Sequence, residues 1–189
     1  SIQTQLLKFS PKKKKIITTI LITAGCLFLL NDFFSFTYLK KLHDRPGSIE
    51  LSKSLKAEIK EETYDGIRDE YRLIDYSINK TAELLQFSKK NNIAEGKANC
   101  VGYARLCAAI YNYAIAVNNL DKRCYAKPVV GHVIMAGLDL NIIIPYIVSP
   151  EMRGFMKDHD FVEFHYSGEN PKKADYADPC IYDYAGVTL

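Results

Sequence analysis

The stretch GKANCVGYARLCAAIYNYA, residues 96 to 114, constrains the fold of this chain more than any other part of its sequence. Apolar or small residues recur there at intervals of three and four, which is the spacing of one buried face of a helix. The recurring residues are Ala104, Cys107, Ala108, Tyr111, Ala114 and Ile115. Cys100 begins this face, so we expect a cysteine at the N-terminus of a buried helix in the middle of the chain.

The segments on either side of this helix differ from each other. Residues 48 to 87 are rich in Glu, Lys, Leu and Ile and lack proline, which predicts helices with a break near residues 64 to 66. Beyond Asn119 the chain changes to short β-branched and aromatic runs, which are typical of strands. These runs are CYAKPVV, HVIMAG, NIIIPYIV, DFVEFHY and ADYADPCIYDY. N-terminal helices, a central helix that begins at the cysteine and an antiparallel sheet predict an α+β fold.

The run NIIIPYIV, residues 141 to 148, is too apolar for an exposed edge strand. We therefore expect it to be mostly buried, in the core or against a membrane or a partner. Pro145 interrupts the run and disfavours one long central strand.

The positive charge of the chain is concentrated near its N-terminus. Residues 1 to 45 carry eight Lys or Arg against two acids, whereas residues 46 to 189 carry seventeen against twenty. The net charge of +3 is therefore a property of the N-terminal segment. The rest of the chain has no basic stripe with interleaved aromatic residues, so nucleic acid is not an expected partner.

An apolar segment follows the basic residues 1 to 15. The run from Ile16 to Leu30 is short for a hydrocarbon core of about 30 Å, but residues up to 38 can lengthen it. No small-residue cleavage site follows, which favours an uncleaved transmembrane signal anchor over residues 16 to 38. The preceding lysines favour a cytoplasmic N-terminus. Residues 39 to 49 are then a linker, and residues 50 to 189 form an extracytoplasmic domain.

Five cysteines are too few for a disulfide scaffold in a chain of 189 residues. Pairing of Cys124 with Cys180, lipidation of Cys26 and a cleaved signal peptide all stay open. The sequence has no C-x-x-C or H-x-x-x-H spacing, so no structural zinc site is predicted. No cofactor is expected, and a bound calcium ion is left open.

The candidate chemistry begins with Cys100. Backbone N–H groups at the start of a helix stabilise a thiolate and can also hold a developing oxyanion. In DHDFVEFHYSG, alternation places His159 on the sheet face opposite that of Val162. Asp178 in YADP follows nineteen residues later, and a hairpin around SGENPKK would bring it beside His159. The chain thus offers a nucleophile, a general base and an orienting acid in that order.

Four segments, NCVGYARLCAAIYNYA, KPVVGHV, HDFVEF and YADP, resemble in this order the transglutaminase-like superfamily of papain-like cysteine enzymes. The resemblance covers roughly residues 67 to 184. It implies a papain-like core and places the family's catalytic triad on Cys100, His159 and Asp178. Phe161 stands where the family has tryptophan, and Asp160 stands where it has a small residue.

The resemblance implies acyl transfer at peptide or glutamine-type amide bonds through a Cys thioester, with a protein or peptide as substrate. Hydrolysis is favoured over cross-linking, because cross-linking needs a second binding groove for which the sequence has no sign. The family also contains catalytically dead domains, so a non-catalytic protein-binding domain is one alternative. A second alternative is a cell-wall peptidase of the NlpC type, in which His132 of GHVIMAG would be the base.

The anchor hypothesis predicts the mass of the mature protein. We expect the full chain to stay in the membrane fraction with its N-terminal segment intact, because no cleavage site follows the apolar run. Mass spectrometry of the purified protein measures this. A mature N-terminus near residue 30 would contradict the anchor, and a lipid on an N-terminal Cys26 would replace it.

Overall fold

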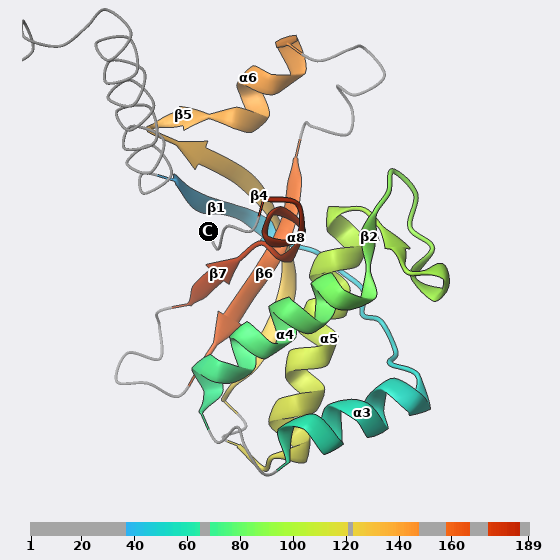
Figure 1. Ribbon diagram of the computed structural model, residues 1–189. Helices are drawn as coiled ribbons and strands as arrows, with labels where there is room; N and C mark the ends of the chain where they lie inside the picture. The colour runs from blue at the N-terminus through green and yellow to red at the C-terminus, as the bar shows by residue number, and fades with distance from the viewer. Residues whose placement is uncertain (1–36, 65–68, 121–122, 148–157, 167–173, 186–189) are drawn as a thin grey trace, which may run out of the picture. The chain divides into compact units, whose positions relative to one another are not determined.

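The computed structural model describes residues 37 to 64, 69 to 120, 123 to 147, 158 to 166 and 174 to 185 (Figure 1). The chain divides into two compact units, one formed by residues 1 to 37 and 135 to 138, the other by residues 38 to 134 and 139 to 189. The basic N-terminus, Cys26 and nearly all of the expected transmembrane span lie outside the described residues.

The second unit combines helices with an antiparallel sheet, as the α+β prediction requires. The described helices are α3 (Lys53–Thr63), α4 (Glu70–Leu84), α5 (Cys100–Val117), α6 (Leu140–Ile147) and α8 (Pro179–Ala185), with a 3₁₀ turn η1 (Ile93–Glu95). The described strands are β1 (Thr37–Asp44), β2 (Gln86–Phe87), β3 (Lys97–Ala98), β4 (Tyr125–Met135), β5 (Leu138–Asp139), β6 (His159–His165) and β7 (Asp175–Ala177). In the main sheet β1, β4, β6 and β7 are neighbours in that order, and β6 is antiparallel to both β4 and β7.

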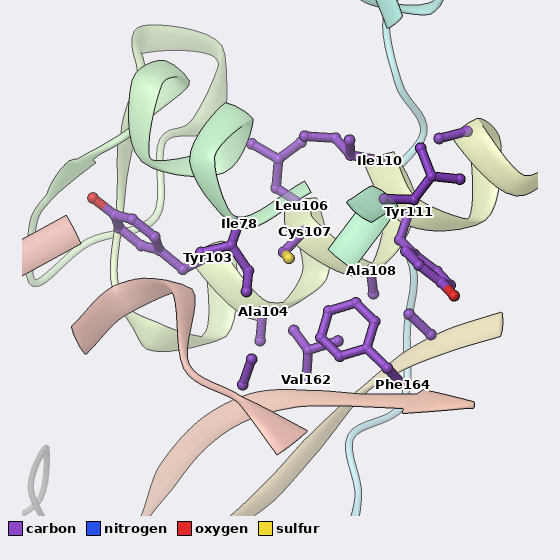
Figure 2. Packing of buried hydrophobic residues seen from close by; sticks show 14 of the residues in the cluster. Ile78, Tyr103, Ala104, Leu106, Cys107, Ala108, Ile110, Tyr111, Val162 and Phe164 are labelled. Atoms are coloured by element: carbon purple, nitrogen blue, oxygen red, sulfur yellow. The ribbon is translucent and has the colours of Figure 1, made fainter. Parts of the chain in front are cut away.

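Helix α5 is the core of this unit. It packs against α3, α4 and α8 and against β6 of the sheet (Figure 1). Its buried face meets α4 and the sheet through the side chains seen in Figure 2, which include Ile78, Tyr103, Leu106, Cys107, Ile110, Tyr111, Val162 and Phe164. Each large apolar side chain buried in this way stabilises the fold by about 1.5 to 3 kcal/mol. The predicted buried face of the cysteine helix is thus confirmed.

Within the described residues, α5 is the one helix that is long and apolar enough to cross a membrane. Most of it is nevertheless buried inside the protein. A core helix passes the same test of length and composition, so this helix carries no argument for a membrane span.

Polar side chains tie the helices together and to the sheet. Asn112 of α5 donates to the carbonyl of Ala126 at 2.8 Å and accepts from its amide at 2.7 Å. The buried Lys80 of α4 donates to Glu58 of α3 at 2.5 Å and to Glu62 at 3.1 Å. A buried ammonium is stable only when carboxylates surround it in this way. These bonds fix α3 against α4 and α5 against β4.

The sheet face opposite α5 carries a second, smaller apolar cluster. It contains Leu39, Val129, Val133 and Phe161. Val162 and Phe164 belong instead to the cluster around α5, so the predicted alternation is confirmed for these three apolar positions of β6. Gly131 lets β1 approach closely, because a Cβ atom at this position would lie 2.2 Å from the carbonyl oxygen of Lys40.

The linker expected over residues 39 to 49 is wrong for its first half. Residues 37 to 44 form β1, an edge strand of the sheet beside β4. Leu39 is buried, and the amide of Arg45 donates to the carbonyl of Pro128 at 3.0 Å. The domain therefore begins before residue 50. The sequence did not predict β1 because most of its side chains are polar or exposed and only Leu39 is buried.

The strand expected over NIIIPYIV is also wrong. Residues 140 to 147 form α6, and Ile142 and Tyr146 are 57% and 82% exposed, so these side chains are not part of the core. Burial against a membrane or a partner stays a prediction. A short apolar run does not by itself distinguish strand from helix. The Asp139 carboxylate accepts from the amides of Asn141 at 3.1 Å and Ile142 at 3.3 Å, and this N-cap starts the helix.

The last expected strand, ADYADPCIYDY, is divided between two elements. Residues 175 to 177 form β7, and α8 begins at Pro179. Asp178 stands at the N-cap and Pro179 at the first helical position, where its fixed φ and missing N–H suit a helix start. The aspartate and proline therefore end the strand and begin a helix.

Removing the hydroxyl group from each of two buried tyrosines of α5 should affect the stability of the fold differently. Within the described residues the Tyr111 hydroxyl is buried without a hydrogen-bond partner, whereas the Tyr103 hydroxyl donates to Asp183. We expect Tyr111→Phe to leave the free energy of unfolding unchanged or to raise it by about 1 kcal/mol. Tyr103→Phe should lower it by roughly 1 to 3 kcal/mol. Urea unfolding of both variants tests this, and an equal loss in both would contradict the assignment.

Candidate active site

Cys100 is the first residue of α5, as the sequence predicts. The helix starts there because the side chain of Asn99 caps it, accepting from the amides of Val101 at 3.1 Å and Gly102 at 3.4 Å. Those two amides are therefore occupied, and the cap does not use the amide of Cys100 itself. The helix end keeps its partial positive charge beside the sulfur, which favours an anion there.

The loop before α5 fixes the position of its first turn. Strands β2 and β3 pair in parallel, and the Asn91 side chain accepts from the amide of Asn99 at 2.9 Å. Gly102 has no room for a side chain, because a Cβ would lie 2.6 Å from both the Asn91 Oδ1 atom and the Ala98 Cβ atom. The loop thus packs directly on the helix start and holds Cys100 in place.

Asp178 lies in the junction between β7 and α8. Pairing of β6 with β7, with Val162 opposite Ala177, brings this junction beside the start of β6. The carboxylate is 1% exposed, and its Oδ1 atom accepts from the amides of Cys180 and Ile181, each at 3.0 Å. Its Oδ2 atom is hydrogen-bonded to Nε2 of His159. Two backbone amides therefore hold the carboxylate in the orientation that binds the imidazole.

His159 lies between Asp178 and Cys100. Burial acts to lower the pKa of His159, but the Asp178 carboxylate and a hydrogen bond with Cys100 raise this pKa well above its ordinary value. Because Asp178 takes Nε2, Nδ1 is the ring nitrogen left for the thiol. An imidazole placed in this way can form an imidazolium and thiolate pair with the cysteine and later return a proton.

An ion pair between Arg45 and Asp160 lies beside the sulfur of Cys100. The Asp160 Oδ2 atom lies 4.0 Å from Sγ of Cys100, and Arg45 binds the same carboxylate with Nε at 2.5 Å and Nη2 at 2.8 Å. The Asp160 hydrogen bonds raise the pKa of Arg45. In the sequence, Asp160 is a difference from the family that the chain resembles and a charge expected to favour the imidazolium of His159. Arg45 was missed, since nothing in the sequence relates a residue near position 45 to one near position 160.

The other buried cysteines have different surroundings. Burial raises the pKa of Cys107 to about 12, which confirms it as a core residue. Burial also raises the pKa of Cys180. Neither Cys124 nor Cys180 is in a disulfide, and the Cys124 thiol donates to Glu70 at 3.1 Å. Among the described cysteines, Cys100 is thus the one set at a helix start between an imidazole and an ion pair.

The remaining histidines of the β-rich half have partners of their own. His132 Nδ1 is bonded to Asp139 Oδ2 at 2.6 Å. His165 stacks on Tyr125 with ring centroids 4.2 Å apart and is bonded to Glu163 at 2.9 Å. The structure thus brings His159 to Cys100 and gives His132 a separate carboxylate.

The described residues around this group do not form a metal site. Within the described ranges, no three His, Cys, Asp or Glu side chains gather as metal ligands would. A cavity of about 670 Å³ lies along another side of α5, lined by residues 47 to 51, Arg105, Asn112 and the start of β4. Its lining does not include Cys100, His159 or Asp178, so it is separate from the candidate site.

Comparison with known proteins found no matching family model, no matching curated protein and no matching solved structure.

The raised pKa of His159 predicts how stability depends on pH. Protonation of this imidazole stabilises the folded state, and the contribution is fully present below the unfolded pKa of about 6.5. It is lost as the pH rises through the folded-state pKa. Between about pH 6 and about pH 10 we expect the free energy of unfolding to fall more in the unmodified chain than in His159→Gln.

Urea unfolding at a series of pH values measures this difference. His43→Gln, at an exposed position on β1, is the matched control and should keep the pH dependence of the unmodified chain. The same pH dependence in His159→Gln and in the unmodified chain would show that His159 holds no extra proton in the folded state.

Proposed function

We propose that this chain is a transglutaminase-like cysteine enzyme with a papain-like core, in which Cys100 is the nucleophile, His159 the general base and Asp178 the orienting acid. The observation that carries the proposal is the position of His159, which is hydrogen-bonded to Asp178 and lies close enough to Cys100 for this cysteine to help raise the pKa of the imidazole. The three residues come from three different elements, and the nucleophile stands at a helix start. This arrangement is the geometry by which nucleophilic cysteines are recognised on unrelated folds.

In the proposed reaction the Cys100 thiolate attacks the carbonyl carbon of a peptide or glutamine-type amide. The bond between carbon and nitrogen breaks, and His159 gives its proton to the departing amine. Water then attacks the thioester carbonyl carbon while His159 takes a proton from that water. The bond between carbon and sulfur breaks, the acid product leaves, and Cys100 is again a thiolate beside the protonated His159. Asp178 holds the ring by Nε2 throughout and stabilises the imidazolium.

A protein or peptide is the proposed substrate, and hydrolysis is the proposed outcome. Water is present at every site, whereas cross-linking requires a second amine held beside the thioester. The cavity described above does not border Cys100, so it supplies no such amine site.

We propose that the domain acts outside the cytoplasm, attached by a single membrane span. The basic residues 1 to 15 before an apolar segment support this orientation.

A non-catalytic binding domain is the second candidate, and one observation favours it. Cys100 is only 6% exposed. A thiol with so little exposed surface is typical of a structural cysteine that packs in the core and does not contact a substrate. The peptidase alternative with His132 as base has less support, because it is His159 whose pKa is raised by an interaction with Cys100.

Reactivity of Cys100 toward iodoacetamide separates these candidates. A thiolate paired with His159 should be alkylated near pH 7 at least about tenfold faster than an ordinary exposed thiol. Trypsin places Cys100 in the peptide 98 to 105 and Cys107 in the peptide 106 to 122, so mass spectrometry follows each residue and Cys107 serves as a buried control. We expect His159→Ala to abolish rapid alkylation and Asp178→Ala to reduce it.

His132→Ala is the matched control and should react as the unmodified chain does. Slow alkylation of Cys100 in the unmodified chain would support the binding domain. A loss of reactivity in His132→Ala with rapid reaction in His159→Ala would instead favour the peptidase alternative.

A further inference from the structure

The Asp160 carboxylate lies where its negative charge disfavours a thiolate on Cys100. Its Oδ2 atom is 4.0 Å from Sγ of Cys100, and the residue is 1% exposed. Water therefore screens this carboxylate little, and a second negative charge on the sulfur would be repelled. The thiolate can form beside Asp160 only if a cation compensates the carboxylate.

Arg45 supplies that cation. Its guanidinium binds both oxygens of Asp160, with Nη2 on the oxygen that faces the sulfur. A guanidinium stays protonated at every relevant pH and fits a carboxylate with two parallel bonds. Because β4 lies between β1 and β6, the side chain reaches across β4 to Asp160, while the Arg45 amide is held by Pro128 at 3.0 Å. The charge balance of the site thus depends on the edge strand β1.

The other charged groups around the sulfur do not replace Arg45. His159 compensates the thiolate itself and is already bonded to Asp178. Asp158, before β6, adds a further negative charge near Arg45, and Cys180 of α8 is neutral because burial raises its pKa. The first turn of α5 contains no acidic residue. Within the described residues, Arg45 is therefore the side-chain cation that compensates the charge of Asp160.

We propose that Arg45 is a positioning residue of the site, whose ion pair with Asp160 makes the Cys100 thiolate possible and makes its reactivity depend on the docking of β1. This inference rests on the proposed function. In a purely structural role the ion pair would fasten β1 to the sheet without affecting the sulfur. The two roles differ in the pH at which Cys100 becomes reactive, which the alkylation rate measures.

The test compares Arg45→Gln, Asp160→Asn and the double variant in the full chain. Site-resolved iodoacetamide alkylation is followed across pH, and thermal unfolding reports the fold. Arg45→Gln should slow alkylation of Cys100 near pH 7 by about ten- to hundredfold and move the pH profile upward by about one to two units, because the carboxylate is then uncompensated. Arg45→Lys should lie between Arg45→Gln and the unmodified chain.

Asp160→Asn removes the repulsion, so Cys100 should react at least as fast as in the unmodified chain. The alkylation rate of Cys100 in the double variant should recover to within a few-fold of the rate in Asp160→Asn. An ion pair that only fastened β1 to the sheet would not give this rescue. A folded Arg45→Gln that reacts normally, a folded Asp160→Asn that reacts slowly, or a double variant as slow as Arg45→Gln would each overturn the inference. A Cys100 that is unreactive in the unmodified chain would overturn the proposed function itself, and this inference with it.

Discussion

The burial of α5 is the constraint on which the rest of this structure depends. The helix contacts α3, α4, α8 and the β6 strand, so the sheet and the helices meet through its side chains. Its interior positions are apolar, and its polar tie to the sheet, Asn112, is bonded in both directions to Ala126. A helix that is buried along most of its length can place a polar group at low cost only at its ends or where, as at Asn112, the hydrogen bonds of that group are satisfied. Cys100, at the N-terminal end, is where a reactive side chain can stand in this core.

The chemistry at that end depends on buried charges that are each fixed by more than one contact. Two backbone amides hold Asp178, which in turn holds His159. Two guanidinium bonds hold Asp160 close to the sulfur. Buried ion pairs contribute little net stability, because desolvation offsets most of their attraction. Their value at this site lies in geometry, since each carboxylate is held in one orientation relative to Cys100.

Strand β1 connects the proposed anchor to the proposed site. It contributes Leu39 to the second apolar cluster, Lys41 to an ion pair with Glu163 at 2.5 Å, and leads to Arg45 beside the sulfur. An edge strand has one free side and is the easiest strand of a sheet to detach.

The sequence by itself determined the class of the fold and the identity of the three candidate residues. Periodicity of 3.6 identifies α5, alternation identifies β6, and Asp178 before Pro179 marks the end of a strand, because each of these signals is local in the chain. The sequence did not determine β1 or α6, whose assignments rest on partners elsewhere: β1 is covered on one side only, and the apolar α6 depends on the cap from Asp139. The contact of Arg45 with Asp160 was decided by tertiary structure alone. Its two residues are separated by 115 positions, and only the order of β1, β4 and β6 in the sheet brings their charges together beside Cys100.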